Sequence, residues 1–481
     1  MPAAIRKGPL LALLAASQFV VVLDASITNV ALPSIGRDLG LSQDSLSWVV
    51  NAYTLTFGGF LLLGGRLADI LGRRRIYMWG LALFAAASFV GGFAQSETTL
   101  IIARAVQGLG AALLSPAALS ILTSTFREGA ERNKALGVWG GVAGAGGAAG
   151  VLLGGLLTEY LSWRWVLFVN VPVAVGAILL APRLVPESRD ERERSGFDVA
   201  GAFTVTAGLA VLIYALVDAN SAGWGSAQTL GLLALAAALL LAFLVIESRA
   251  AAPLVPFDVF QSRTRTGAYA TGLLVGASLF SMFFFISLYM QQVLGWDALK
   301  SGLAYLPLAV TIIISAGIAS VLVTKIGFKP VVIAGLLSVA AGLFLFSRIA
   351  VDGSFAGDIL VPSLLAAVGL GFSFVPVTIG GTTGIAADEA GLASGLINAG
   401  QQVGGALGLA ILAAVATART DAVATGPGRP GPEALTEGFQ AAFLGGTLFA
   451  LVGAVLAAIL IRSADSRALI GQSPEGVAGP V

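Results

Sequence analysis

The sequence predicts an all-α polytopic membrane protein with 14 transmembrane helices. Of its 481 residues, 57% are hydrophobic and only 11% are charged, whereas an ordinary soluble domain is about 25% charged. Fourteen stretches of roughly 20 residues carry almost no charge, and each is long enough to cross a bilayer. A water-soluble fold has no way to bury this much apolar surface, so lipid must be the solvent.

The 14 predicted spans are joined by short loops. They lie near residues 10–32, 47–65, 76–95, 99–122, 135–157, 165–181, 199–217, 227–246, 267–290, 302–323, 331–347, 359–381, 393–416 and 440–461. Arg6 and Lys7 precede the first apolar run, as they would in a secretory signal. That run is too long for a signal and contains Asp24 and Asn29, so we expect a retained transmembrane helix.

The distribution of Lys and Arg predicts that both termini lie in the cytoplasm. With the N-terminus inside, 20 of the 27 Lys and Arg residues fall in cytoplasmic segments and 6 in external ones, Arg104 being the remaining one. Multi-pass proteins show this positive-inside bias. The loop at 382–392 fits least well, because it is predicted cytoplasmic yet contains Asp388, Glu389 and no base.

Composition excludes several classes of enzyme. The chain contains no Cys and no His, which excludes disulfides, thiol nucleophiles, a Ser–His–Asp triad and histidine proton relays. No Gly-Lys dipeptide occurs, so a Walker loop and an ATP-driven pump are excluded. With no metal-ligand cluster and a net charge of +1, we expect no enzyme activity, no metal, no cofactor and no nucleic-acid partner.

Asp24 and Arg104 are the two ionisable side chains deep inside the predicted spans. A charge at the bilayer centre costs at least about 2.5–3.5 kcal/mol, so a chain that keeps one acid and one base there is expected to use them. Span arithmetic places both at similar depth near the outer side. We therefore expect an ion pair in which Asp24 carries the coupling proton and releases Arg104. The alternative is a permanent structural ion pair.

A tight loop after the second span reads GRLADILGRRR and has the composition of a conformational latch. Gly65 and Gly72 permit close backbone approach. Asp69 can accept hydrogen bonds from a neighbouring helix N-terminus and pair with Arg73 or Arg74. These five residues form the predicted latch. The alternative is a generic positively charged cytoplasmic loop.

Polar side chains inside other spans are candidates for a substrate cavity, since a cavity for drug-like compounds is largely apolar with a few polar anchors. The candidates are Gln18, Asn29, Asn51, Tyr53, Gln291, Gln292, Asn398, Gln401 and Gln402. For any one of them, a hydrogen bond between helices is an equally good explanation.

Five segments together resemble one protein family. Residues 65–75 resemble the signature loop of the major facilitator superfamily, and residues 100–119 resemble its fourth-span motif. Residues 21–35 resemble the first-span motif of the drug–proton antiporter branch with fourteen spans. Residues 161–175 and 391–412 resemble further stretches of that branch. The matches lie in both halves of the chain.

This resemblance implies the major facilitator fold, with two six-helix bundles and two extra central helices. The implied segments are an N-terminal bundle at 1–181, a linker with the two extra helices at 182–265, a C-terminal bundle at 266–462 and a cytoplasmic tail at 463–481. A faint internal repeat agrees, because Gly72 and Arg74 match Gly327 and Lys329 at an offset of 255. Repeated halves are common in secondary transporters.

One feature departs from the family pattern. Antiporters of this family usually carry a Gly-Pro pair in the fifth span, and Val151 stands here where the proline is expected. Gly144, Gly150 and Gly154 remain, and small residues let helices pack closely or slide. We expect these three glycines to serve helix packing or gating. The alternative is tight packing alone.

The function that the resemblance implies is proton-coupled antiport. The protein would export drug-like or antibiotic amphiphilic compounds across a bacterial cytoplasmic membrane by alternating access, and so confer antibiotic or multidrug resistance. Its expected partners are a small amphiphilic substrate, protons and the lipid bilayer, and we expect a monomer. The alternatives are a proton-coupled nutrient uptake symporter of the same superfamily and a non-transporting receptor or structural membrane protein.

Overall fold

The structure is a computed structural model that describes residues 6–41, 43–127, 129–187, 198–250, 253–385, 390–424, 430–468 and 470. Within those ranges every regular element is helical. Fourteen helical segments are long and apolar enough to cross a membrane, at the 14 places predicted from the sequence. Many of them extend beyond the predicted apolar stretch: the fifth covers Ala130–Tyr160 instead of 135–157.

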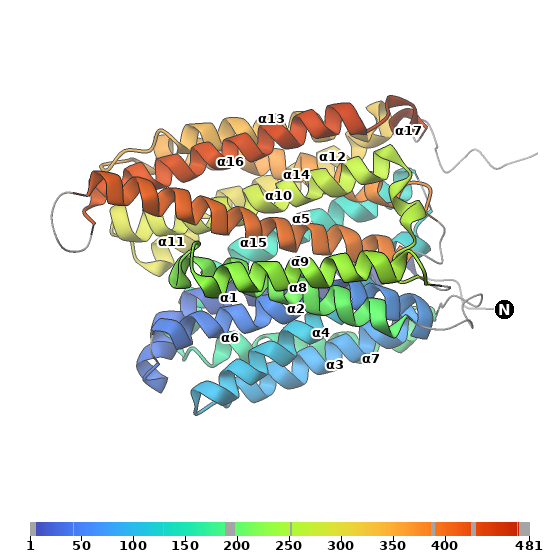
Figure 1. Cartoon of the computed structure of the whole chain (residues 1–481), viewed down its shortest axis with the longest axis horizontal. Coiled ribbons are helices and arrows are strands. Elements are labelled where there is room, and N and C mark those ends of the chain that lie inside the picture. The colour runs from blue at the N-terminus through green and yellow to red at the C-terminus, as the bar shows by residue number, and fades with distance from the viewer. Residues whose placement is uncertain are drawn as a thin grey trace, which may run out of the picture. The chain divides into compact units, whose positions relative to one another are not determined.

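The chain forms two compact units, and the first comprises Met1–Phe126, Ala149–Gln261 and Gly384–Ala399. Within it α4 is central and packs against α1, α2 and α3, while α7 packs against α1 and α3. Its helices are α1 (Lys7–Leu39), α2 (Gln43–Leu71), α3 (Arg73–Gly92), α4 (Glu97–Thr125), the end of α5 (Ala130–Tyr160), α6 (Trp165–Phe168), α7 (Asn170–Leu184), α8 (Val199–Ala222), α9 (Ala227–Glu247), η1 (Phe257–Phe260) and the start of α15 (Ala390–Val423). Figure 1 shows α3 and α4 as neighbours along most of their length.

The second unit comprises Arg127–Ala148, Ser262–Thr383 and Gly400–Val481. Here α14 is central and packs against α10, α12 and α13, while α16 packs against α10 and α13. Its helices are the start of α5, α10 (Arg263–Leu288), η2 (Tyr289–Val293), α11 (Ala298–Ala304), α12 (Leu306–Ile326), α13 (Phe328–Phe346), η3 (Phe355–Leu360), α14 (Val361–Thr382), the rest of α15, α16 (Pro432–Leu460) and α17 (Ser463–Arg467).

The two units repeat one internal packing pattern. In each, the fourth long helix lies against the first three and crosses the third through glycines. A Cβ added to Gly110 would lie 2.6 Å from the backbone nitrogen of Phe84, and a Cβ added to Gly369 would lie 2.5 Å from that of Val339. Phe84 and Val339 are separated by the same 255 positions that separate Gly72 from Gly327. The faint repeat in the sequence therefore corresponds to a repeated helix packing.

The helices α8 and α9 form the extra pair, which comes between the repeated sets in the sequence and belongs to the first unit. The helix α8 packs against α2 and α9, and a Cβ added to Gly59 of α2 would lie only 3.1 Å from the Cβ of Ala210. Only 17% of the α9 span is buried inside the protein, so most of its surface is left for lipid. The division into four segments, at 181, 265 and 462, stays a prediction.

Candidate functional site

Asp24 of α1 and Arg104 of α4 form a buried ion pair. Nη1 of Arg104 lies 2.6 Å from Oδ2 of Asp24, and the side chains are 1% and 0% exposed, respectively. The helix α4 begins at Ser96, whose hydroxyl accepts a hydrogen bond from the backbone N–H of Thr99. This cap places Arg104 about two turns inside the helix. The pairing that span arithmetic predicts is present, and its role in transport stays a prediction.

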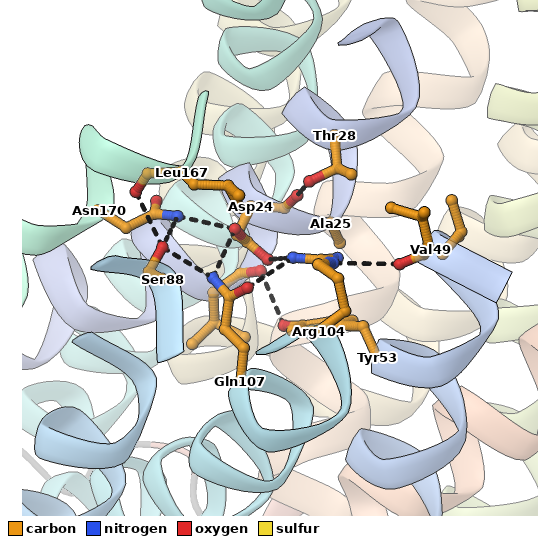
Figure 2. Close-up of polar contacts among 12 residues, drawn as sticks. Asp24, Ala25, Thr28, Val49, Tyr53, Ser88, Arg104, Gln107, Leu167 and Asn170 are labelled. Atoms are coloured by element: carbon orange, nitrogen blue, oxygen red, sulfur yellow. Dashed lines mark hydrogen bonds and ion pairs between the residues drawn. The ribbon is translucent and has the colours of Figure 1, made fainter. Parts of the chain in front are cut away.

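Two side-chain amides complete the surroundings of the Asp24 carboxylate (Figure 2). Nε2 of Gln107 and Nδ2 of Asn170 each donate to Oδ1 of Asp24 at 2.7 Å. Both amides also donate to the hydroxyl of Ser88 at 3.1 Å, and that hydroxyl donates to the carbonyl of Leu167 at 2.8 Å. Three N–H donors, from Arg104, Gln107 and Asn170, thus converge on one carboxylate.

Arg104 is also anchored without Asp24. Its Nε donates to the carbonyl of Val49 at 3.1 Å, and Nη1 donates to Oε1 of Gln107 at 2.8 Å. The guanidinium lies over the ring of Tyr53, 4.4 Å from the ring centroid, a favourable cation–π contact. Tyr53, one of the predicted cavity residues, is buried beside the ion pair, and its part in a substrate cavity stays a prediction.

The sequence argument does not select Ser88 or Asn170, and it includes Gln107 only within residues 100–119, the stretch that resembles the fourth-span motif. Asn170 offered a usable signal, because a lone amide in an apolar span must find a partner. It is the first residue of α7, directly after Val169, within the sixth span. Ser88 offered no signal, since a serine can satisfy itself on its own helix.

Two of the predicted packing glycines bring α5 against α1 beside Asp24. A Cβ added to Gly150 would lie 2.8 Å from the carbonyl oxygen of Leu23, and one added to Gly154 would lie 3.0 Å from that of Ile27. The backbones of the two helices therefore nearly touch, without the proline that the family usually carries here. Gly144 lies on the same helix, and its surroundings fall outside the part of the chain that the structure describes.

Three of the five predicted latch residues meet at the start of α15. Oδ1 of Asp69 accepts from Nη2 of Arg73 at 3.0 Å and from the backbone N–H of Gly391 at 3.1 Å. Oδ2 of Asp69 accepts from the backbone N–H of Leu392 at 3.0 Å. A Cβ added to Gly65 would lie 2.5 Å from the carbonyl oxygen of Gly391. A helix N-terminus and an arginine are the partners that the sequence predicts for Asp69.

The other two latch residues make a separate contact. Gly72 has a φ of 107°, in the region that favours glycine. The backbone N–H of Arg74 donates to Oε1 of Glu187 at 3.2 Å, and its Nε lies 3.5 Å from Oε2 of the same carboxylate. Arg74 therefore pairs with Glu187 and Arg73 with Asp69.

The predicted cavity residues of the first unit have different surroundings. Gln18 is buried and its Oε1 accepts from the hydroxyl of Ser115 at 3.0 Å. Asn29 is exposed and donates to a carbonyl of its own helix, as does the half-buried Asn398. Asn51 lines a small pocket of about 10 Å³, together with Trp48, Leu55, Ile213 and Tyr214.

The predicted cavity residues of the second unit lie on two elements. Gln291 and Gln292 are exposed in η2, whereas Gln401 and Gln402 are half-buried in α15. A Cβ added to Gly276 of α10 would lie 2.2 Å from the carbonyl oxygen of Gln401, so this part of α15 packs closely on α10. The grouping of all nine residues into one cavity stays a prediction.

A buried acid–base pair inside a bundle of transmembrane helices, beside helix crossings made of glycine, is typical of a secondary membrane transporter. The chain belongs to the major facilitator superfamily, whose family model matches residues 14–409. A solved structure of the human organic anion transporter MFSD10 (TETRAN) shares the fold with a TM-score of 0.67, at 15% identity and over 94% of this chain and 100% of that one.

The chain is also similar to bacterial resistance and export proteins. It is 42% identical over 460 residues to the puromycin resistance protein pur8 of Streptomyces alboniger, covering 94% of this chain and 91% of that one. It is 41% identical over 471 residues to the cephamycin export protein CmcT of Amycolatopsis lactamdurans, covering 97% and 94%. It is 34% identical over 407 residues to the multidrug transporter protein MdtP of Bacillus subtilis, covering 84% and 74%.

Proposed function

We propose that the protein is a proton-coupled antiporter that exports amphiphilic antibiotics or other drug-like compounds across the cytoplasmic membrane of a bacterium. The observation that carries the proposal is the sealed pair of Asp24 and Arg104. A membrane protein keeps such charges where they serve ion movement, because their insertion is costly. Both termini face the cytoplasm in this proposal, the protein acts as a monomer without a cofactor, and the proton gradient supplies the energy.

The proton acts on α1 in this mechanism. A proton taken up by Asp24 removes its negative charge and with it most of the attraction to Arg104. Arg104 keeps its bonds to the carbonyl of Val49 and to Gln107, so α1 is the element that is released. Because α1 touches the backbone of α5 at Gly150 and Gly154, a shift of α1 moves α5 as well.

In this mechanism the predicted latch, at the C-terminal end of α2, opens and closes together with the change at Asp24. Asp69 holds the start of α15 through the backbone N–H groups of Gly391 and Leu392. Separation of α15 from α2 breaks these bonds and leaves the carboxylate to Arg73. Alternating access then consists of breaking and remaking this contact as Asp24 binds and releases its proton.

The names of the relatives support the substrate class. They include resistance or export proteins for puromycin, cephamycin and, at 34% identity over 418 residues, tetracenomycin C. The sparse polar residues of the spans also suit amphiphilic compounds, since a sugar site needs many converging polar groups.

Transport into inverted membrane vesicles tests the proposal. We expect vesicles to accumulate at least one of puromycin, cephamycin, tetracenomycin C or a cationic dye when a pH gradient is applied, and an uncoupler to abolish it. Asp24→Asn should insert normally and bind substrate but lose gradient-driven accumulation. The matched control is Asp352→Asn, which removes an exposed carboxylate and should transport normally. Normal gradient-driven transport by Asp24→Asn, or uptake of a nutrient instead of export, would overturn the proposal.

A further inference from the structure

One acceptor in the Asp24 network has no hydrogen bond within the described part of the chain. It is Oδ1 of Asn170, and Asn170 is fully buried. The other end of the same amide is fully used, since Nδ2 donates to both Asp24 and Ser88. A buried acceptor without a partner costs about 1–3 kcal/mol, so its place beside a titratable carboxylate calls for a physical reason.

The surroundings of Asp24 decide which of its oxygens takes a proton. Oδ2 lies 2.6 Å from Nη1 of Arg104, and a hydrogen there would point at a cation. Oδ1 is therefore the oxygen that takes the proton. Oδ1 faces the N–H groups of Gln107 and Asn170, so a new O–H meets two donors and no acceptor. One neighbour must change to accept it.

Among the described neighbours, Asn170 is the one that can change without disturbing Arg104. A guanidinium has no acceptor. Gln107 has one, but its Oε1 already binds Nη1 of Arg104 at 2.8 Å, and turning its amide would set N–H against the guanidinium. The titratable and charged groups that face Asp24 are Arg104 of α4 and Tyr53 of α2, while α3 and α7 contribute the neutral Ser88 and Asn170.

We propose that the amide of Asn170 turns over when Asp24 takes up its proton, so that Oδ1 of Asn170 accepts the new hydrogen bond. This inference rests on the proposed function and makes Asn170 a positioning residue for the coupling proton. The proton comes from the aqueous phase, forms one O–H bond on Oδ1 of Asp24 and changes the charge of that group from −1 to 0. The amide then points its oxygen, instead of its nitrogen, at the carboxyl group.

The turn is energetically accessible because the amide is asymmetric in its contacts. Rotation about the last bond of an asparagine side chain has two broad wells. In either orientation one end of the amide is paired and the other is not, but the turn exchanges an unpaired carbonyl for an unpaired NH2 group and gives up the bond from Nδ2 to Ser88. The new bond from protonated Asp24 offsets this loss, so the turned orientation is favoured only when Asp24 carries its proton. Proton uptake at Asp24 is thereby transmitted to Asn170, the first residue of α7.

Infrared difference spectroscopy on the full-length protein in bilayers tests this directly. The protein is grown with asparagine labelled with ¹³C at the side-chain carbonyl, and spectra are compared at neutral and acidic pH. We expect acidification to produce a protonated carboxyl band and, with the same midpoint, a shift of a labelled amide carbonyl band. The other Asp and Glu side chains, 25 of the 26 in the chain, also protonate on acidification, so the Asp24 signal is the part of the carboxyl band that unlabelled Asp24→Asn lacks.

Variants of the two amides separate the possible outcomes. Asn170→Leu should lose the labelled shift and lower proton-driven efflux at least tenfold, with substrate binding retained. If it does not insert, Asn170→Gln keeps an amide that carries no label and should also lose the shift. Gln107→Leu is the matched control and should keep it. If the labelled amide band does not shift with pH, or if it still shifts in a variant without Asn170, the amide turn alone is refuted. A carboxyl band of equal amplitude in Asp24→Asn and in the wild type shows that Asp24 takes up no proton, and it refutes the proposed function instead.

Discussion

The backbone N–H of Leu392 donates to Oδ2 of Asp69 at 3.0 Å, across 323 positions of sequence. The first N–H groups of a helix have no partner within the helix, and the N-terminus carries a partial positive charge. Asp69 at the end of α2 therefore acts as a cap for the distant helix α15. Arg73 binds the same carboxylate and is positioned to hold it when the cap opens.

Asp69→Asn tests the cap. The substitution keeps an acceptor but removes the charge that favours the helix N-terminus, a contribution of about 0.3–1 kcal/mol or somewhat more when buried. We expect the transport rate in proteoliposomes to fall severalfold while substrate affinity stays within about twofold. Arg75→Gln, an exposed charge of the same loop, is the control and should leave the rate unchanged. Equal rates in both variants would contradict a latch.

The ion pair and the Asp69 contact were predictable because each rests on a strong and specific physical rule. A charge inside a span must be paired, so Asp24 and Arg104 had to find each other. A carboxylate in the last turn of a helix, before the glycine that follows the helix, is suited to bind another helix N-terminus. Neither argument needs the detailed packing of the helices.

The rest of the site depends on packing that the sequence does not encode locally. Ser88 and Asn170 matter only because α3 and α7 bring them to the same oxygen of Asp24. The pairing of Arg74 with Glu187 instead of Asp69 follows from where the chain turns after α7. A similar contact occurs at the matching position of the second unit. There the backbone N–H of Lys329, which corresponds to Arg74, donates to a side-chain oxygen, the hydroxyl of Ser466, at 2.9 Å.

Gly150→Ala and Gly147→Ala form a matched pair on α5. A Cβ at Gly150 would lie 2.7 Å from the Cβ of Ser26, whereas a Cβ at Gly147 meets no described atom within 4 Å. We expect Gly150→Ala to lower the melting temperature, with a cost of about 1–3 kcal/mol for overpacking, and to slow transport. Gly147→Ala should match or slightly exceed wild-type stability, since alanine favours helix over glycine by about 1 kcal/mol. Equal melting temperatures would show that α1 and α5 do not pack this closely.

The surroundings of Asp38, which lies outside the membrane spans, predict that the stability of the protein depends on pH. A hydrogen bond from Trp163 and another from Arg164 hold the pKa of this half-exposed carboxyl below its ordinary value of 3.8. Its ionised form is thus stabilised in the folded protein, a contribution that is present above about pH 4 and lost as pH falls through the lowered pKa. Asp38→Asn should therefore lower the free energy of unfolding at pH 7 by less than about 1 kcal/mol, seen as a slightly lower melting temperature than that of the wild type. The gap should close toward pH 3; a gap that widens on acidification contradicts this assignment.

Arg104→Lys and Arg164→Lys compare two arginines that make similar contacts but differ in solvent exposure. Each donates through Nη1 to an aspartate of α1, at 2.6 and 2.7 Å, and each lies over an aromatic ring, at 4.4 and 4.5 Å from the centroid. Arg104 is sealed, whereas the side chain of Arg164 is 32% exposed.

The expected results of the two substitutions differ for that reason. Lysine keeps the charge but lacks the planar fork, so Arg104→Lys leaves the carbonyl of Val49 or Oε1 of Gln107 without its donor in a place that water does not reach. We expect proton-driven efflux to fall at least tenfold, with a stability loss of a few kcal/mol from a damaged buried pair. Arg164→Lys should change either quantity little, because solvent replaces the lost bonds. Comparable efflux from the two variants would show that the charge of Arg104, and not its geometry, is what transport requires.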